Sequence, residues 1–188
     1  MHFLTGLAVA FQIGGTSPVR VRIETSLGTI EAGIDSAKAP RTAANFLRYV
    51  DASAYDNARF HRTMRADNQP NDSVRIAVIQ ASVDSMHGAR EQKPIELERT
   101  TVTGLRHVDG TLSMARNGPD TATSGFFICI GNQPALDFGG HRNLDGQGFA
   151  AFGRVTRGMD VVQKIQASGA QGQRLTPPVL ITRIVRIR

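Results

Sequence analysis

Three places in this 188-residue chain carry side chains that are common in catalytic or metal sites. Cys129, the single cysteine, stands in the apolar run 126–130; no neighbouring base can be assigned to lower its pKa, so we expect a small core residue. Residues Asn143–Gly148 resemble the start of a calcium loop but lack a properly spaced closing glutamate. A third group lacks the spacing of a metal site: Asp84, His87 and Glu91. The sequence therefore predicts neither a bound metal nor a cofactor.

The chain is basic, with 22 lysine and arginine residues against 16 acidic ones, a net charge of +6 and a pI of about 10.4. Basic proteins bind nucleic acid when their positive side chains form a patch or a run. Here the arginines are scattered singly, and Arg183, Arg186 and Arg188 alternate with apolar residues, as on the solvent face of a strand. We therefore predict a solvated basic surface and no nucleic-acid partner.

The elements that would position a site are short strands and two helices. The alternating run Val19–Thr25 and the run Thr29–Ile34, joined by a turn, predict a β-hairpin. Pro40 can occupy the first turn of an amphipathic helix, and a second helix is predicted from Met159 to Ala167. The other predicted strands are Arg59–Met64, Val74–Ala81, Thr111–Ala115, Phe126–Gly131, Phe149–Val155 and Val179–Arg188. Many strands with only two helices predict a barrel or sandwich.

The length and the absence of a long linker predict a single main domain. We expect residues 1–18 to form an N-terminal extension or the remnant of a signal peptide, followed by one domain over residues 19–188. The apolar opening stretch ends near an Ala-x-Ala pattern but lacks a basic start. A clipped signal peptide would place the protein in the periplasm or outside the cell, and otherwise it would be cytoplasmic. No apolar stretch approaches the ~20 residues that span a bilayer.

Five short segments stand out by their order and spacing: Phe60–Arg62, Val78–Gln80, Gly110–Arg116, Phe126–Ile128 and Phe152–Val155. Together they resemble the cyclophilins, a family of peptidyl-prolyl cis–trans isomerases, over most of the chain. The loops 65–73 and 137–148 are longer than in the shortest members, which is similar to a bacterial subgroup. The resemblance implies a mainly β fold, a closed eight-stranded antiparallel β-barrel capped by two α-helices, in agreement with the predicted elements.

The resemblance implies an enzyme that accelerates rotation about Xaa-Pro bonds and assists protein folding. Such a bond rotates over a barrier of ~18–20 kcal/mol because the nitrogen lone pair is delocalised into the carbonyl group. The twisted transition state loses this delocalisation, so its nitrogen accepts a hydrogen bond more readily. A donor aimed at that nitrogen and an apolar pocket for the proline ring would bind the twisted state best. The implied partners are proline-containing segments of unfolded or flexible proteins, and the protein is expected to be a monomer.

The residues that match the family's motifs are implied to have two kinds of role. Arg62 matches the arginine of the Phe-His-Arg motif and would be the catalytic donor, with Gln80 beside it bonding the substrate backbone. His61 is expected to be structural, since the reaction needs no general base. The segment at Ala115 would pair with the substrate as an added strand. The residues implied to bind substrate are Phe60, Val78, Ala115, Arg116, Phe127, Leu136 and Phe149.

Four positions depart from the family pattern near the implied cleft. Ala135 replaces a tryptophan, and Gly125 replaces a glutamine that bonds the substrate. Ala77 stands at the position of a pocket phenylalanine, in a strand whose register is open by one residue, and Phe149 replaces a histidine. These changes leave an alternative open, in which the chain binds proline peptides as a chaperone or adaptor but catalyses slowly.

Overall fold

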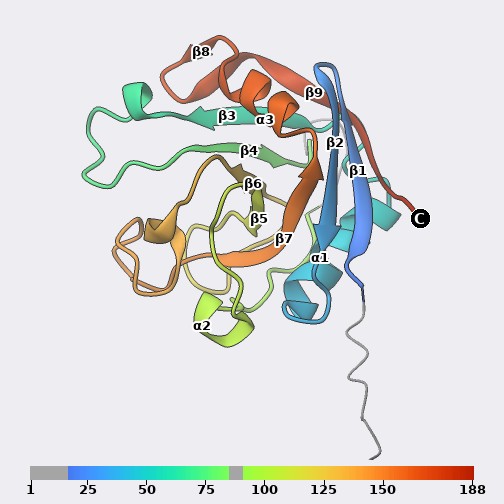
Figure 1. The fold of residues 1–188 in the computed structure, drawn as a ribbon, viewed down its shortest axis with the longest axis horizontal. Helices are drawn as coiled ribbons and strands as arrows, with labels where there is room; N and C mark the ends of the chain where they lie inside the picture. Colours follow the sequence, from blue (N-terminus) through green and yellow to red (C-terminus); the bar gives the residue numbers. More distant parts are fainter. Residues whose placement is uncertain (1–16, 85–90) are drawn as a thin grey trace, which may run out of the picture.

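The structure, a computed structural model, describes residues 17–84 and 91–188, so most of the predicted extension, as well as His87, lies outside it. In the described residues one antiparallel sheet curls into a closed barrel (Figure 1). Its strands are β1 (Val19–Thr25), β2 (Gly28–Ile34), β3 (Arg59–Met64), β4 (Val78–Ser82), β5 (Thr111–Met114), β6 (Phe126–Cys129), β7 (Ala150–Arg157) and β9 (Arg174–Arg186). They follow the order β1-β2-β7-β5-β6-β4-β3-β9, and pairing of β1 with β9 closes the barrel. The predicted eight-stranded barrel is confirmed.

A short hairpin extends the sheet beyond the eight strands of the barrel. The two-residue strand β8 (Ala170–Gln171) pairs with the start of β9, so that Gln171 lies opposite Arg174. β9 therefore begins earlier than the predicted strand Val179–Arg188. The turn between β8 and β9 lies beside β3, because the backbone amide of Thr63 donates to the carbonyl of Gln173 at 2.8 Å.

β4 begins later than the alternation of the sequence predicted. The expected strand Val74–Ala81 is a loop as far as residue 77. In this loop the buried Gln69 side chain bonds the backbone of Ile76 twice: its Nε2 donates to the carbonyl at 2.7 Å, and its Oε1 accepts from the amide at 3.2 Å. The side chain takes the place of a neighbouring strand, so the loop is stable without joining the sheet.

Two helices of two or more turns cover the barrel near opposite ends, as predicted (Figure 1): α1 (Pro40–Asp51) and α3 (Met159–Gln166). The sequence did not predict a third, one-turn helix, α2 (Thr100–Thr103), because threonine and valine favour strands. Gly104, with φ +70°, ends α2. Among the described residues no helix has the length and apolar character needed to cross a membrane.

The buried apolar side chains form two separate clusters, and β6 contributes to both. Phe126 and Ile128 point into the main core inside the barrel, whereas Phe127 and Cys129 point outward, as the period-two geometry of a strand requires. We call the outer group the apolar cup; it consists of Met64, Ile76, Val78, Phe127, Cys129, Leu136 and Phe149. Cys129 is fully buried in it, which raises the pKa of its thiol far above the ordinary value.

Candidate active site

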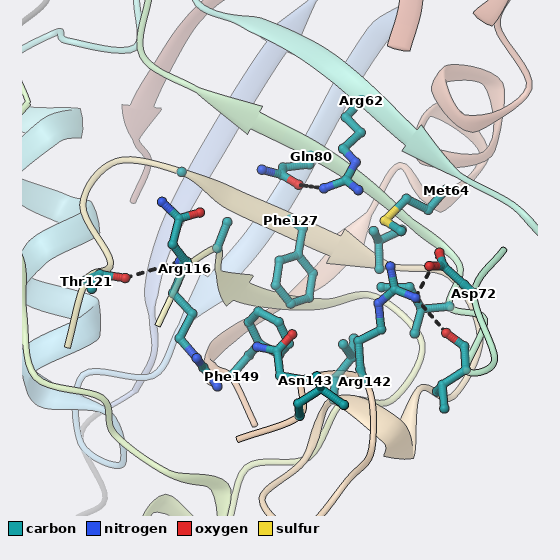
Figure 2. A pocket seen from close by; sticks show the side chains of 18 of the residues that line it. Arg62, Met64, Asp72, Gln80, Arg116, Thr121, Phe127, Arg142, Asn143 and Phe149 are labelled. Carbon is teal, nitrogen blue, oxygen red and sulfur yellow. Dashed lines mark hydrogen bonds and ion pairs between the residues drawn. The ribbon is translucent and has the colours of Figure 1, made fainter. Parts of the chain in front are cut away.

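A cleft of about 760 Å³ lies over the apolar cup (Figure 2). Arg62 on β3, Gln80 on β4 and Phe127 on β6 all line it. The pairing of the strands explains why they meet: Arg62 lies opposite Gln80, and Gln80 lies opposite Phe127, so the three form one row across the sheet. Two loops, residues 65–77 and 137–148, contribute further lining residues.

The floor of the cleft is apolar. Phe127 and Phe149 meet edge to face with their ring centroids 5.4 Å apart, and Leu136 and Val78 pack in the same cluster. Figure 2 shows the Phe127 ring pointing into the space between Arg62 and Phe149. The floor is therefore suited to a small apolar group.

The guanidinium of Arg62 is a fixed, charged donor at this floor. Its Nη1 donates to Gln80 Oε1 at 3.4 Å and its Nε donates to Gln173 Oε1 at 3.0 Å, while Nη2 donates to the same Gln173 oxygen. Burial lowers the pKa of Arg62, and the positive charge of Arg142 acts in the same direction. An arginine pKa starts so high that the side chain stays charged at neutral pH.

Arg116 is anchored in the wall of the cleft. Its Nη1 and Nη2 donate to the two carboxylate oxygens of Asp145 at 2.7 and 2.9 Å, and its Nε donates to the Gly148 carbonyl at 2.8 Å. Its guanidinium carbon lies 5.0 Å from the centroid of the Phe149 ring, a cation–π contact. The hydrogen bonds from Arg116 lower the pKa of Asp145 to about 2. In the calcium-like segment the carboxylate of Asp145 is thus bound to an arginine.

Arg142 joins the two loops that border the cleft. Its Nη1 donates to the Val74 carbonyl at 2.6 Å and lies 3.0 Å from a carboxylate oxygen of Asp72, and its backbone amide donates to the Ala135 carbonyl at 3.1 Å. Its side chain is only 15% exposed. Figure 2 shows Arg142 reaching toward Asp72 across this end of the cleft. The bridge holds loop 65–77 against loop 137–148.

The family follows from comparison with known proteins. The family model described as cyclophilin type peptidyl-prolyl cis-trans isomerase/CLD matches residues 20–186. The chain belongs to the cyclophilins. Peptidyl-prolyl cis-trans isomerase A of Dickeya dadantii is 36% identical over 163 residues, covering 86% of this chain and 77% of that relative. Isomerase B of Escherichia coli is 34% identical over 161 residues, covering 84% and 92%.

The fold of this cyclophilin also matches a solved structure. The crystal structure of a cyclophilin type isomerase of Cryptosporidium parvum matches with a TM-score of 0.72, covering 90% of this chain and 99% of that one. The two sequences are only 21% identical, so the likeness shows a shared barrel.

Most residues predicted for the cyclophilin site line the cleft: Arg62, Val78, Gln80, Ala115, Arg116, Phe127, Leu136 and Phe149. Phe60 does not, and this prediction needs correction. Its side chain is fully buried in the main core, with its ring centroid 6.0 Å from that of Phe126. Residues two apart on a strand normally share a face, but β3 has a register shift between Phe60 and Arg62. The bulge leaves Phe60 inside the barrel and turns Arg62 outward.

Two apolar residues of the cup that also line the cleft were not predicted from the sequence. Ile76, in the loop before β4, packs into the cup, whereas the next residue, Ala77, does not. Met64 also belongs to the cup, and its place two residues after Arg62 on β3 is a signal that could have identified it. Gly125 lines the cleft, and a Cβ at this position would meet Ala115 at 3.4 Å, an ordinary contact.

A buried polar network supports the floor from below, and no sequence pattern pointed to it. The ring of His107 stacks on Phe127 with centroids 6.0 Å apart and planes at 18°. Its Nδ1 lies 2.7 Å from Asp137 Oδ1 and its Nε2 lies 2.9 Å from Ser113 Oγ. These residue types also form hydrolytic triads, but Ser113 is 0% exposed, so its hydroxyl cannot reach a substrate. The network positions Phe127.

Proposed function

We propose that the isomerase reaction of this cyclophilin takes place in the cleft, with Arg62 as the catalytic donor and Gln80 beside it. The observation that carries the proposal is that one cavity contains both the charged guanidinium of Arg62 and the apolar cup around Phe127. The proline ring would sit on Phe127, Leu136 and Val78, which removes its apolar surface from water. Arg62 would then face the amide nitrogen.

The geometry favours the twisted state of the peptide bond over the planar one. A planar amide nitrogen shares its lone pair with the carbonyl group and offers little to a donor, whereas the twisted nitrogen is a good acceptor. The Arg62 donor is already oriented and partly buried, so it needs little reorganisation when the bond twists. Its contribution is therefore larger in the transition state than in the ground state, which is the condition for catalysis.

The peptide backbone on either side of proline would be held by polar groups at the rim. Gln80 accepts from Arg62 through Oε1, so its amide N–H groups remain available to a substrate carbonyl. The segment at Ala115 continues from β5 and would pair with an extended peptide as an added strand. The Cryptosporidium parvum cyclophilin was crystallised in the presence of the dipeptide Ala-Pro, in line with a small proline ligand.

The proposed partners are proline-containing segments of unfolded or flexible proteins, bound by a monomer. Several basic side chains outside the cleft are paired with carboxylates: Arg183 lies 2.9 Å from Glu24, and Arg186 lies 2.7 Å from Asp51. Such pairing supports a solvated surface rather than a phosphate-binding one.

Replacing the donor tests the proposal. Arg62→Ala is expected to lower kcat/KM for a short Xaa-Pro peptide by about 10²-fold, or ~3 kcal/mol of transition-state stabilisation, because the twisted nitrogen loses its hydrogen bond. A protease-coupled assay measures the rate, and the exposed Lys164→Ala on α3 is the control.

The two interpretations of the chain predict different results for the wild type. Rate enhancement that disappears in Arg62→Ala supports the enzyme. Peptide binding without rate enhancement would instead show the slow chaperone or adaptor, and a wild-type rate in Arg62→Ala would remove Arg62 from the mechanism.

A further inference from the structure

Arg62 is held from two sides, and only one of its partners belongs to the cleft. Gln80 is in the neighbouring strand and lines the cavity, as Figure 2 shows. Gln173 comes from the turn between β8 and β9, and its Oε1 accepts from both Nε and Nη2 of Arg62. Gln173 therefore accepts two hydrogen bonds from the guanidinium, whereas the predicted partner Gln80 accepts one.

The turn that carries Gln173 is fixed independently of this side chain. The Gln173 carbonyl accepts from the Thr63 amide at 2.8 Å, and the Gly172 carbonyl accepts from Asn68 Nδ2 at 3.0 Å. Thr63 directly follows Arg62 on β3, so the turn is attached to the strand beside the residue that its glutamine holds. The backbone of Gln173 is therefore placed by contacts that a substitution of its side chain leaves intact.

The two contacts leave part of the guanidinium available to a substrate. A guanidinium has five N–H donors. Nε uses its single N–H on Gln173, Nη2 uses one there, and Nη1 uses one on Gln80. The two remaining donors, one on each terminal nitrogen, are free of those contacts.

The chemical type of the partners also matters. Both acceptors are neutral amides. Among the residues the structure describes, Arg62 has no carboxylate at ion-pair distance. The negative charge of Asp72 acts on the pKa of Arg62, but the Asp72 carboxylate is paired with Arg142. A carboxylate in place of Gln173 would neutralise the cation and compete for its donors. A neutral amide fixes the orientation and leaves the full positive charge for the amide nitrogen of the substrate.

We propose that Gln173 is a positioning residue of the isomerase, which holds the Arg62 guanidinium so that its two free N–H groups face the apolar cup. This inference rests on the proposed role of Arg62. Gln173 acts through Arg62, has no contact with the substrate and accelerates the reaction by removing rotational freedom from the donor before the peptide binds.

The test is a double-mutant cycle. Gln173→Met keeps the length of the side chain and removes the acceptor; kcat is expected to fall about tenfold with KM nearly unchanged, because the proline still binds the cup. In an Arg62→Ala background the same substitution should cause no further loss, since nothing remains to be positioned. Gln171→Met, an exposed position in the same hairpin, is the matched control and should keep the wild-type kcat. Melting temperatures of all variants exclude a loss of fold.

The outcomes separate this inference from the proposal on which it rests. If Arg62→Ala keeps the wild-type rate, the assignment of Arg62 fails and Gln173 has nothing to position. If Arg62→Ala is inactive but Gln173→Met keeps the wild-type kcat, only the inference about Gln173 is overturned. Equal losses from Gln173→Met in both backgrounds, or a lowered melting temperature that accounts for the loss, would show a merely structural role and overturn it as well.

Discussion

Three side chains that line the cleft lie in one row across three neighbouring strands. Arg62, Gln80 and Phe127 are cross-strand neighbours, and Ser113 on β5 continues the row beyond Phe127. Ser113 in turn contacts His107, which stacks on the underside of the floor. The polar residues that bond Arg62 and those that support the floor thus belong to one continuous set of contacts.

The buried pair beneath the floor gives a prediction at the residue scale. His107→Phe keeps an aromatic ring against Phe127 but leaves the Asp137 carboxylate without the imidazole donor at 2.7 Å. The free energy of unfolding is expected to fall by about 2 kcal/mol, measured by urea denaturation, because a buried charged acceptor loses one of its hydrogen-bond donors. Ser113→Ala removes only a neutral hydrogen bond and should cost about 1 kcal/mol. Equal effects of the two substitutions would contradict the importance of the hydrogen bond between His107 and Asp137.

At the scale of elements, the cleft is a strand surface enclosed by two loops. β3, β4 and β6 supply the row of functional side chains, while loops 65–77 and 137–148 form the walls. Loop 65–77 is stabilised by an internal contact of Gln69 with Ile76, and loop 137–148 by the contact of its Asp145 with Arg116, which follows β5. Arg142 connects them, so the width of the cleft at this end depends on a single guanidinium.

Removing the bridge should affect binding more than chemistry. Arg142→Ala frees loop 65–77 from loop 137–148, and we expect KM for an Xaa-Pro peptide to rise about threefold to tenfold with little change in kcat, because Arg62 keeps its partners. Steady-state kinetics at several peptide concentrations measure the two parameters separately. An unchanged KM, or a loss confined to kcat, would show that the bridge does not shape the cleft.

At the scale of the whole molecule, the two apolar clusters lie on opposite faces of the same sheet. The main core fills the barrel with fully buried rings such as Phe46, Phe60 and Phe126, and the cup lies on the outside of the same strands. Because the sheet separates them, the cup can keep a hollow at its surface while the core is closely packed.

The stability of the whole molecule at low pH depends on its pairs of arginine and carboxylate side chains. Hydrogen bonds from arginine lower the pKa of Glu24, Asp51 and Asp145, the last to about 2. A carboxylate with a lowered folded-state pKa contributes stability that is present above its unfolded pKa, near 4, and is lost as the pH falls through its folded value. The melting temperature of the wild type should therefore drop between about pH 4 and pH 2. Asp145→Asn is less stable at neutral pH and should converge with the wild type near pH 2; a constant difference at all pH values would contradict the ion pair.

Particular residues show what sequence patterns could and could not reveal. Alternation placed β1 and β3 at the observed residues, and helical spacing placed α1 and α3, because both periods are local properties of the backbone. The motif match placed Phe60 at the site together with Arg62, but a bulge between the two residues leaves them on opposite faces of the strand. The loop before β4 was taken for strand, since its stability comes from the Gln69 side chain rather than from a sheet partner.

The sequence by itself determined the barrel, the family and the strand residues at the centre of the cleft, because these depend on local periodicity and on short motifs within single strands. Only the tertiary structure decided how Arg62 is held, what supports Phe127 and what joins the two loops. Gln173, His107 and Arg142 reach their partners across gaps of 111, 30 and 68 residues in the chain. No local pattern encodes such contacts, since they exist only after closure of the barrel has brought distant segments together.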